Sequence, residues 1–134
     1  MPQISAIHHV AVTVTDLERS AAWYADLLSL QRLMDGTHPD GGGRLVLLGR
    51  PDLSFSVALH GHDTNEKEPF AESRTGLDHV SFLVSGRDEL KAWEQELASR
   101  GIEHSPLNEQ GGYAVVVFRD PDNIQLEMIA VGPA

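Results

Sequence analysis

The stretch HHVAVTVTDLERSAAWYADLL, residues 8–28, has a counterpart in DHVSFLVSGRDELKAWEQELA, residues 78–98. At a constant shift of 70 residues and without a gap, His9 matches His79, and Trp23 matches Trp93, which are the chain's only two tryptophans. The same shift places RPD at 50–52 on DPD at 120–122. Self-similarity at a fixed spacing is the signature of a repeated structural unit. The sequence therefore predicts two copies of one unit.

Each copy begins with a strand and continues into a helix. Val10, Val12 and Val14 alternate with smaller or polar residues, which is typical of a strand with one buried face. Asp16 is a suitable N-cap for a helix that is expected to run to about Leu30. In the second copy, the helix is expected to run from about Arg87 to Arg100 and to stop at Gly101.

Further strands are expected after each helix. The stretches GGGRLVLLG and GGYAVVVFRD each read as strands led by glycine, and LSFSVALH and NIQLEMIAV each follow a Pro-Asp turn. Each unit is therefore predicted to be βαβββ, which makes the protein α+β. We expect a single domain over 1–134, with module one at about 5–62, a linker at about 63–75 and module two at about 76–131.

Composition narrows the classes of function. The 134-residue chain has no cysteine, which excludes disulfides and thiolate sites, and its formal net charge is −10. An acidic protein repels phosphate backbones, which argues against nucleic acid and anionic membranes as partners. No apolar run approaches the ~20 residues of a membrane span, and no basic leader precedes one, so we expect a cytoplasmic protein.

Because side chains alternate along a strand, both matched histidines are expected on the face of their strand that is turned away from the helix. If Val10 and its alternating partners face the helix, then His9 faces away, and so does His79 in the second copy. Glu127 is a charged residue inside an apolar strand, where a carboxylate needs a partner. One histidine at a strand end is more often an ordinary polar residue than a ligand. Two at matched positions, together with Glu127, favour a metal site of the type with two imidazoles and one carboxylate.

Three segments resemble the vicinal oxygen chelate superfamily, which includes glyoxalase I, fosfomycin-resistance thiol transferases, extradiol dioxygenases and bleomycin-resistance proteins. They are HHVAVTVTDLERSAAWYADLLSL, GLDHVSFLV and FRDPDNIQLEMI. The resemblance implies paired βαβββ modules that form an incomplete barrel around a central cleft. It also implies a homodimer, and His9, His79 and Glu127 as ligands of a divalent metal ion, which could be Zn, Ni, Co, Mn or Fe(II).

The identity of a fourth ligand stays open in the sequence. The ungapped register places Val57 opposite Glu127, and valine cannot bind a metal, which lowers the case for glyoxalase I itself. A gapped register could bring His60 there as a ligand or a catalytic base, and His62 shares its face. Both could instead be solvated residues at a strand end.

Three further side chains have groups that can donate or accept hydrogen bonds. Tyr113, which follows QGG, could donate a hydrogen bond to a substrate oxygen, or could be an ordinary half-exposed aromatic residue at a strand start. His38 and His104 lie in polar loop contexts and are interpreted as surface residues.

Two classes of function follow from these residues. The first is a metal-dependent enzyme acting on a small oxygen-chelating substrate, of the lyase, isomerase, thiol transferase or dioxygenase type. The second is a non-catalytic protein that sequesters a ligand or drug, of the bleomycin-resistance type. The predicted ligands His9, His79 and Glu127 favour the enzyme.

Overall fold

The computed structural model describes residues 1–52 and 55–134, and the chain forms two compact units, 1–68 and 69–134. Leu53 and Ser54, which begin the predicted strand LSFSVALH, lie outside the described residues. The first unit contains β1 (His9–Thr13), α1 (Leu17–Leu28), β2 (Gln31–Thr37), β3 (Gly43–Gly49) and β4 (Ser56–His62). The second contains β5 (Val80–Leu83), α2 (Arg87–Ser99), β6 (Asn108–Glu109), β7 (Tyr113–Arg119) and β8 (Gln125–Val131). The α+β class and the two βαβββ modules are confirmed.

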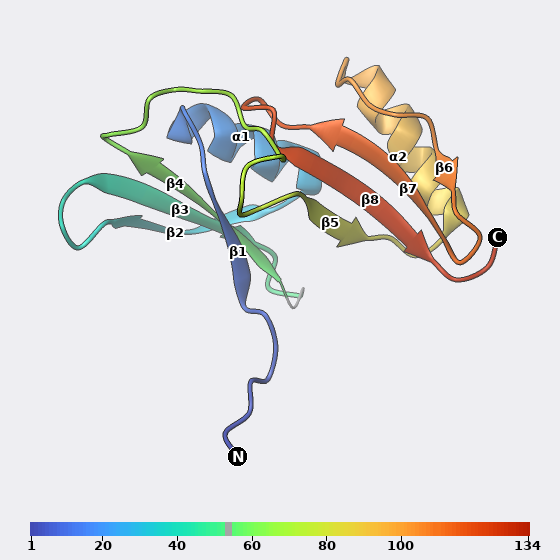
Figure 1. Cartoon of the computed structure of the whole chain (residues 1–134), viewed down its shortest axis with the longest axis horizontal. Coiled ribbons are helices and arrows are strands. Elements are labelled where there is room, and N and C mark those ends of the chain that lie inside the picture. Colours follow the sequence, from blue (N-terminus) through green and yellow to red (C-terminus); the bar gives the residue numbers. More distant parts are fainter. Residues whose placement is uncertain (53–54) are drawn as a thin grey trace. The chain divides into compact units, whose positions relative to one another are not determined.

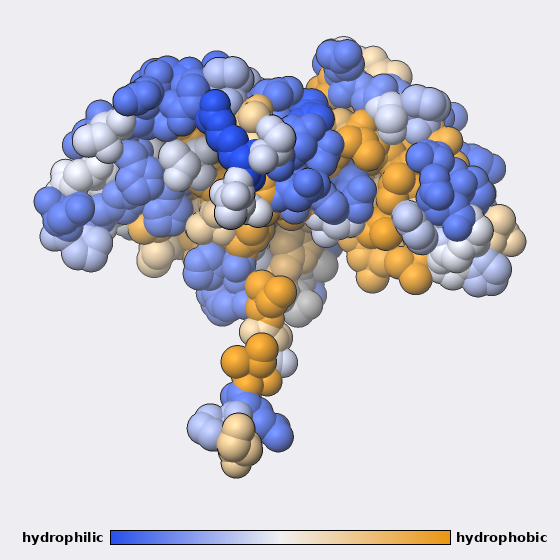
Figure 2. All heavy atoms as spheres, in the orientation of Figure 1, coloured by the Kyte–Doolittle hydropathy of each residue, from blue (hydrophilic) through white to orange (hydrophobic). Residues whose placement is uncertain are grey.

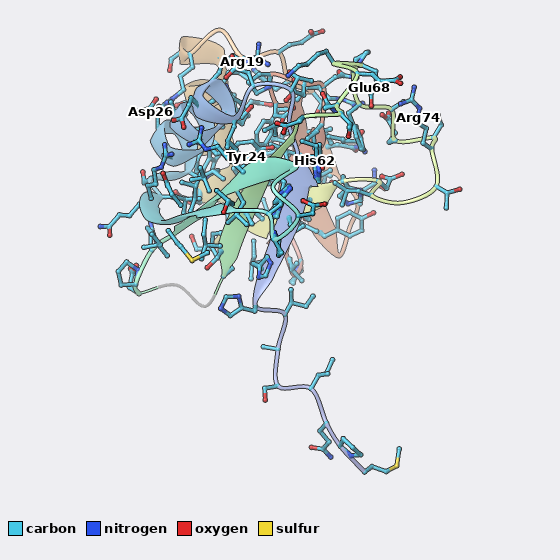
Figure 3. All side chains as sticks on the ribbon, turned by 90° about the vertical axis from the view of Figure 1, so that its left-hand side faces the viewer. Arg19, Tyr24, Asp26, His62, Glu68 and Arg74 are labelled. Carbon is cyan, nitrogen blue, oxygen red and sulfur yellow. The ribbon has the colours of Figure 1, made fainter. Side chains whose placement is uncertain are left out.

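The first unit is a four-stranded mixed sheet with the order β1-β4-β3-β2, covered on one face by α1 (Figure 1). The strand β1 is parallel to β4, and the other neighbours are antiparallel. Asp16 caps α1, because its carboxylate accepts the backbone N–H of Arg19 at 3.1 Å. Ser29 adopts a left-handed conformation with φ 53°, so the helix ends before the predicted Leu30. Tyr24 of α1, labelled in Figure 3, is 1% exposed.

The second unit repeats this arrangement with the order β5-β8-β7-β6 and with α2 against β7 and β8 (Figure 1). Leu90 and Leu97 of α2 are fully buried. The helix ends one residue before the predicted Arg100, and Gly101 follows with a φ of +67° that favours glycine. Among the described residues, neither helix is long and apolar enough to cross a membrane.

Side chains alternate across each sheet as predicted. Val12 and Val14 are buried, while Ala11 and Thr13, which alternate with them, are exposed. In β8, the buried residues are Leu126, Met128 and Ala130. We call the opposite side of each sheet, turned away from its helix, the open face. Figure 2 shows hydrophobic atoms over the second unit toward the ends of β5 and β8.

The boundary between the units falls inside the predicted linker, between Glu68 and Pro69. Within residues 69–75, Phe70 and Glu72 form polar contacts with other parts of the second unit. The backbone N–H of Phe70 donates to the carbonyl of Asp122 at 2.8 Å, and Glu72 forms an ion pair with Arg119 at 2.9 Å. The single domain and the closure of the modules into an incomplete barrel stay predictions.

Candidate metal site

His79 and Glu127 meet on the open face of the second unit. Glu127 of β8 pairs with Ser81 of β5, and His79 lies two positions before Ser81, on the same face. The Nε2 atom of His79 lies 3.6 Å from Oε1 of Glu127. The Glu127 side chain is only 16% exposed, so its carboxylate has little water around it. A divalent cation between these two groups would supply the opposite charge that this carboxylate needs.

Asp78 fixes which nitrogen of His79 is available. Its carboxylate Oδ1 lies 2.7 Å from Nδ1 of His79 and accepts the proton carried there. In the neutral ring this leaves Nε2, the atom facing Glu127, with a free lone pair. Metal-binding histidines usually donate their other N–H to such a carboxylate, which fixes ring orientation and raises basicity. The residues present therefore fit a divalent metal ion.

A hydrogen-bonded chain extends behind Asp78. The amide Nε2 of Gln125 donates to Oδ1 of Asp78 at 3.1 Å, and Nη2 of Arg119 donates to Oε1 of Gln125 at 3.1 Å. Both terminal nitrogens of Arg119 donate to the carboxylate of Glu72 at 2.9 Å. These hydrogen bonds hold the pKa of Glu72 at about 2. These hydrogen bonds could not be predicted from the sequence, because Glu72 lies in the predicted linker and no local pattern joins it to β7.

His9 belongs to the first unit and is the counterpart of His79. Its exposed ring places Nδ1 2.9 Å from Nδ1 of the neighbouring His8, so His8 stands where Asp78 stands in the second copy. Here too the contact occupies Nδ1. The convergence of His9 with His79 and Glu127 stays a prediction.

The strand register corrects the predicted counterpart of Glu127. Ala11 pairs with Ala58, whereas Ser81, its counterpart at the shift of 70, pairs with Glu127. Ala58 therefore occupies the equivalent position, one residue after the expected Val57. His60 pairs with Thr13 and corresponds to Ile129, so it lies two residues beyond that position on the same face. The first unit has no carboxylate where the second has Glu127.

Three histidines meet on the open face of the first unit instead. One metal-binding atom from each of His38, His60 and His62 lies within 4.8 Å of the others, so this histidine cluster could hold a metal ion. The interpretation of His38 as a surface residue is wrong, because its ring is half-buried and its Nε2 lies 2.9 Å from Nδ1 of His60. Figure 3 labels His62, the last residue of β4.

The surroundings of His60 favour its neutral form. Burial lowers its pKa, and the neighbouring His38, His62 and His9 lower it further by repulsion between positive charges. A neutral imidazole is the form that binds a metal ion.

The two remaining candidates lie elsewhere in the second unit. Tyr113 shares the open face with Val117, the residue paired with Glu127, but four strand positions, about 13 Å, separate them. Tyr113 is therefore not beside Glu127 within this sheet. His104, interpreted from the sequence as a surface residue, is half-buried and forms an isolated bridge to Phe118.

Residues 6–128 match the model of the Glyoxalase/Bleomycin resistance protein/Dioxygenase superfamily. The chain belongs to this superfamily. The superfamily member from Frankia sp. EAN1pec, known from a crystal structure of its glyoxylase/bleomycin resistance protein/dioxygenase domain, is 33% identical to it. The TM-score is 0.86, with 96% of this chain and 99% of that one covered. The resemblance stated from the sequence is thus confirmed.

Two curated relatives extend the comparison within the superfamily. The uncharacterized protein YwkD of Bacillus subtilis is 28% identical over 127 residues, which cover 93% of this chain and 96% of the relative. The ethylmalonyl-CoA/methylmalonyl-CoA epimerase of Cereibacter sphaeroides is 27% identical over 97 residues, which cover 66% of this chain and 70% of the epimerase. The superfamily therefore includes an enzyme related to this chain.

Proposed function

We propose that this protein is a divalent-metal-dependent enzyme that acts on a small substrate offering oxygen ligands. The observation that carries the proposal is the geometry of His79, whose Nε2 lies 3.6 Å from Oε1 of Glu127 while its Nδ1 is bonded to Asp78. An imidazole nitrogen and a carboxylate oxygen so disposed are suited to one shared cation.

His9 is proposed as the third protein ligand. Its support is the repeat, which gives it the position of His79, and its contact with His8, which occupies the same ring nitrogen. Because Ala58 stands where a fourth ligand would be, the protein would supply three ligands. Two imidazoles and one carboxylate leave positions open for a substrate.

The metal ion, when bound, would polarise and orient substrate oxygen atoms as a Lewis acid. The chain's own contribution is to hold His79 through Asp78 and Gln125, so that the ligand is placed before substrate arrives. The reaction class remains lyase, isomerase, thiol transferase or dioxygenase. The relation to a CoA-ester epimerase makes proton exchange next to a thioester carbonyl the first reaction to assay.

The test begins with the metal-free full chain, titrated with Zn²⁺, Ni²⁺, Co²⁺ and Mn²⁺ in a calorimeter. His79→Ala and Glu127→Gln should each weaken binding at this site by more than about tenfold, because even loss of an outer partner costs 10- to 100-fold. His104→Ala removes a histidine without touching the site and should bind as the parent does. Binding that is equal in all variants would refute the site.

Activity separates the two classes of function. Methylmalonyl-CoA in heavy water would reveal exchange of the proton beside the carbonyl, and this exchange should require both added metal and Glu127. A purified chain that carries no metal, yet tightly retains an unchanged small ligand, would instead support the sequestering protein of the bleomycin-resistance type.

A further inference from the structure

The histidine cluster is built by the strand register of the first sheet. Gly43 of β3 pairs with His62 of β4, and on its other side the N–H of His38 donates to the Gly43 carbonyl at 2.8 Å. His38 and His62 thus flank a residue without a side chain, and their ring centroids lie 4.6 Å apart. His60 faces the same side, two positions before His62.

The His38 ring occupies space that is free only because residue 43 is a glycine. A Cβ atom at this position would lie 2.6 Å from Nδ1 of His38 and would also clash with the carbonyl oxygen of Gly61. The backbone of His38 is fixed as well, because its carbonyl accepts the N–H of Gly41 at 2.9 Å. The histidine is therefore held by a hairpin rather than by a free loop, which is what a preorganised ligand requires.

The nitrogen positions are close to those of a coordination shell. The two facing nitrogens of His38 and His60 are 2.9 Å apart, and one ligand atom from each of the three rings lies within 4.8 Å of the others. Two nitrogens at 2.0–2.1 Å from a tetrahedral ion are separated by about 3.3 Å. This value lies between the 2.9 Å of the His38–His60 pair and the 4.8 Å upper limit for all three rings, so small side-chain rotations would suffice. The contact between the His38 and His60 nitrogens is a hydrogen bond, in which one ring donates and the other accepts.

We propose that His38, His60 and His62 form a second metal centre, which shares no ligand with the His79–Glu127 site and binds a transition-metal cation such as Zn²⁺, Ni²⁺ or Cu²⁺. Imidazole nitrogen suits these ions, whereas Mg²⁺ and Ca²⁺ prefer oxygen ligands. Three protein ligands leave one tetrahedral position for water or for a further ligand. The exposed His62 gives the ion access from solvent.

The decisive experiment uses the full chain with Glu127→Gln as background, which removes one ligand of the other site and so weakens metal binding there. Co²⁺ alone is the probe, because its visible absorption reports tetrahedral coordination and its titration gives affinity. The background variant should still bind a single ion, and excess Mg²⁺ should not displace it. Adding His62→Ala should weaken this binding by more than about tenfold, a lower limit taken from the loss of outer partners. Adding His104→Ala should leave it unchanged.

A glycine pair provides a second test. Gly43→Ala should displace the His38 ring and weaken Co²⁺ binding in the same background, while Gly112→Ala should be neutral because nothing lies within 4 Å of a Cβ there. Circular dichroism checks that each variant is folded. The proposal is overturned if the Glu127→Gln background binds no Co²⁺, or if the folded His62→Ala variant binds it as tightly as the background does. The His79–Glu127 site would be untouched by either result.

Discussion

At the scale of single residues, Asp78 decides what His79 can do. A neutral imidazole has one nitrogen with a proton and one with a lone pair, and the side chain beside it selects between them. The Asp78 carboxylate accepts a hydrogen bond from Nδ1 of His79 at 2.7 Å, which leaves the lone pair on Nε2, the nitrogen that faces the Glu127 carboxylate. His8 stands at this position in the first copy and can contact His9 without a negative charge.

Replacing Asp78 should therefore weaken the metal site without removing a ligand. Asp78→Ala should cost about 10- to 100-fold in metal affinity, the usual cost of losing an outer partner. Asp78→Asn keeps an oxygen that can accept the Nδ1 proton, so it should lose less. Glu103→Ala, which removes an exposed carboxylate elsewhere in the unit, is the control for charge. Calorimetric titration measures all four proteins, and equal affinities for parent and Asp78→Ala would contradict the assigned role.

At the scale of elements, alternation and the repeat predicted β1, β5 and both helices closely. They also placed His79 and Glu127 on one face, because side-chain parity along a strand is a local property. The repeat predicts a strand directly after each helix but does not give its residues. The sequence QRLMDGT of β2 lacks clear alternation and contains a register shift between Arg32 and Met34. His38 directly follows this strand, which is why its place in the histidine cluster was missed.

The register of β4 shows a second feature that the sequence repeat does not predict. The segment between Gly49 and Ser56 holds six residues, and the equivalent one between Arg119 and Gln125 holds five. An ungapped comparison cannot detect this difference, because the shift of 70 remains correct up to β3 and β7. This error of one residue in the register predicts Val57, instead of Ala58, as the counterpart of Glu127. It also moved the expected side chain to the wrong face of the sheet.

The ion pair between Glu72 and Arg119 predicts that the stability of the fold depends on pH. Hydrogen bonds from Arg119 lower the pKa of Glu72 from 4.5 to about 2 in the folded state. A carboxylate with a depressed folded pKa stabilises the fold above its unfolded pKa, and this contribution is lost as the pH falls. The contribution of Glu72 is thus present at neutral pH and disappears between about pH 4.5 and 2.

Thermal unfolding at pH 7 and pH 3 tests this ion pair. Glu72→Gln should lower the unfolding midpoint at pH 7, and its midpoint should fall less than that of the parent on acidification. The parent's other ion-paired carboxylates, including Glu18 and Glu109, will produce a remaining shift in both proteins. Glu68→Gln makes the same charge change in the neighbouring unit and should follow the parent. A pH dependence unchanged by Glu72→Gln would rule out the ion pair as its source.

At the scale of the whole molecule, one end of the open face of the second unit exposes several large apolar side chains. Leu83 is 74% exposed and Val131 is 65% exposed, and Tyr113, paired with Val131, is 43% exposed. Polar residues occupy the other end of the same face, where Glu127 and Gln125 lie. Large apolar side chains grouped in this way are typical of an association surface.

The homodimer implied by the family resemblance should therefore form through this end of the face. Light scattering at micromolar concentration should give twice the chain mass of 14.7 kDa. Leu83→Lys would bury a charge in such an interface, which is costly unless the charge is paired, so this variant should shift toward monomer. Ala92→Lys adds the same charge to an exposed position of α2 and should remain dimeric. A monomeric parent would refute the dimer, and a dimeric Leu83→Lys variant would move the interface elsewhere on the molecule.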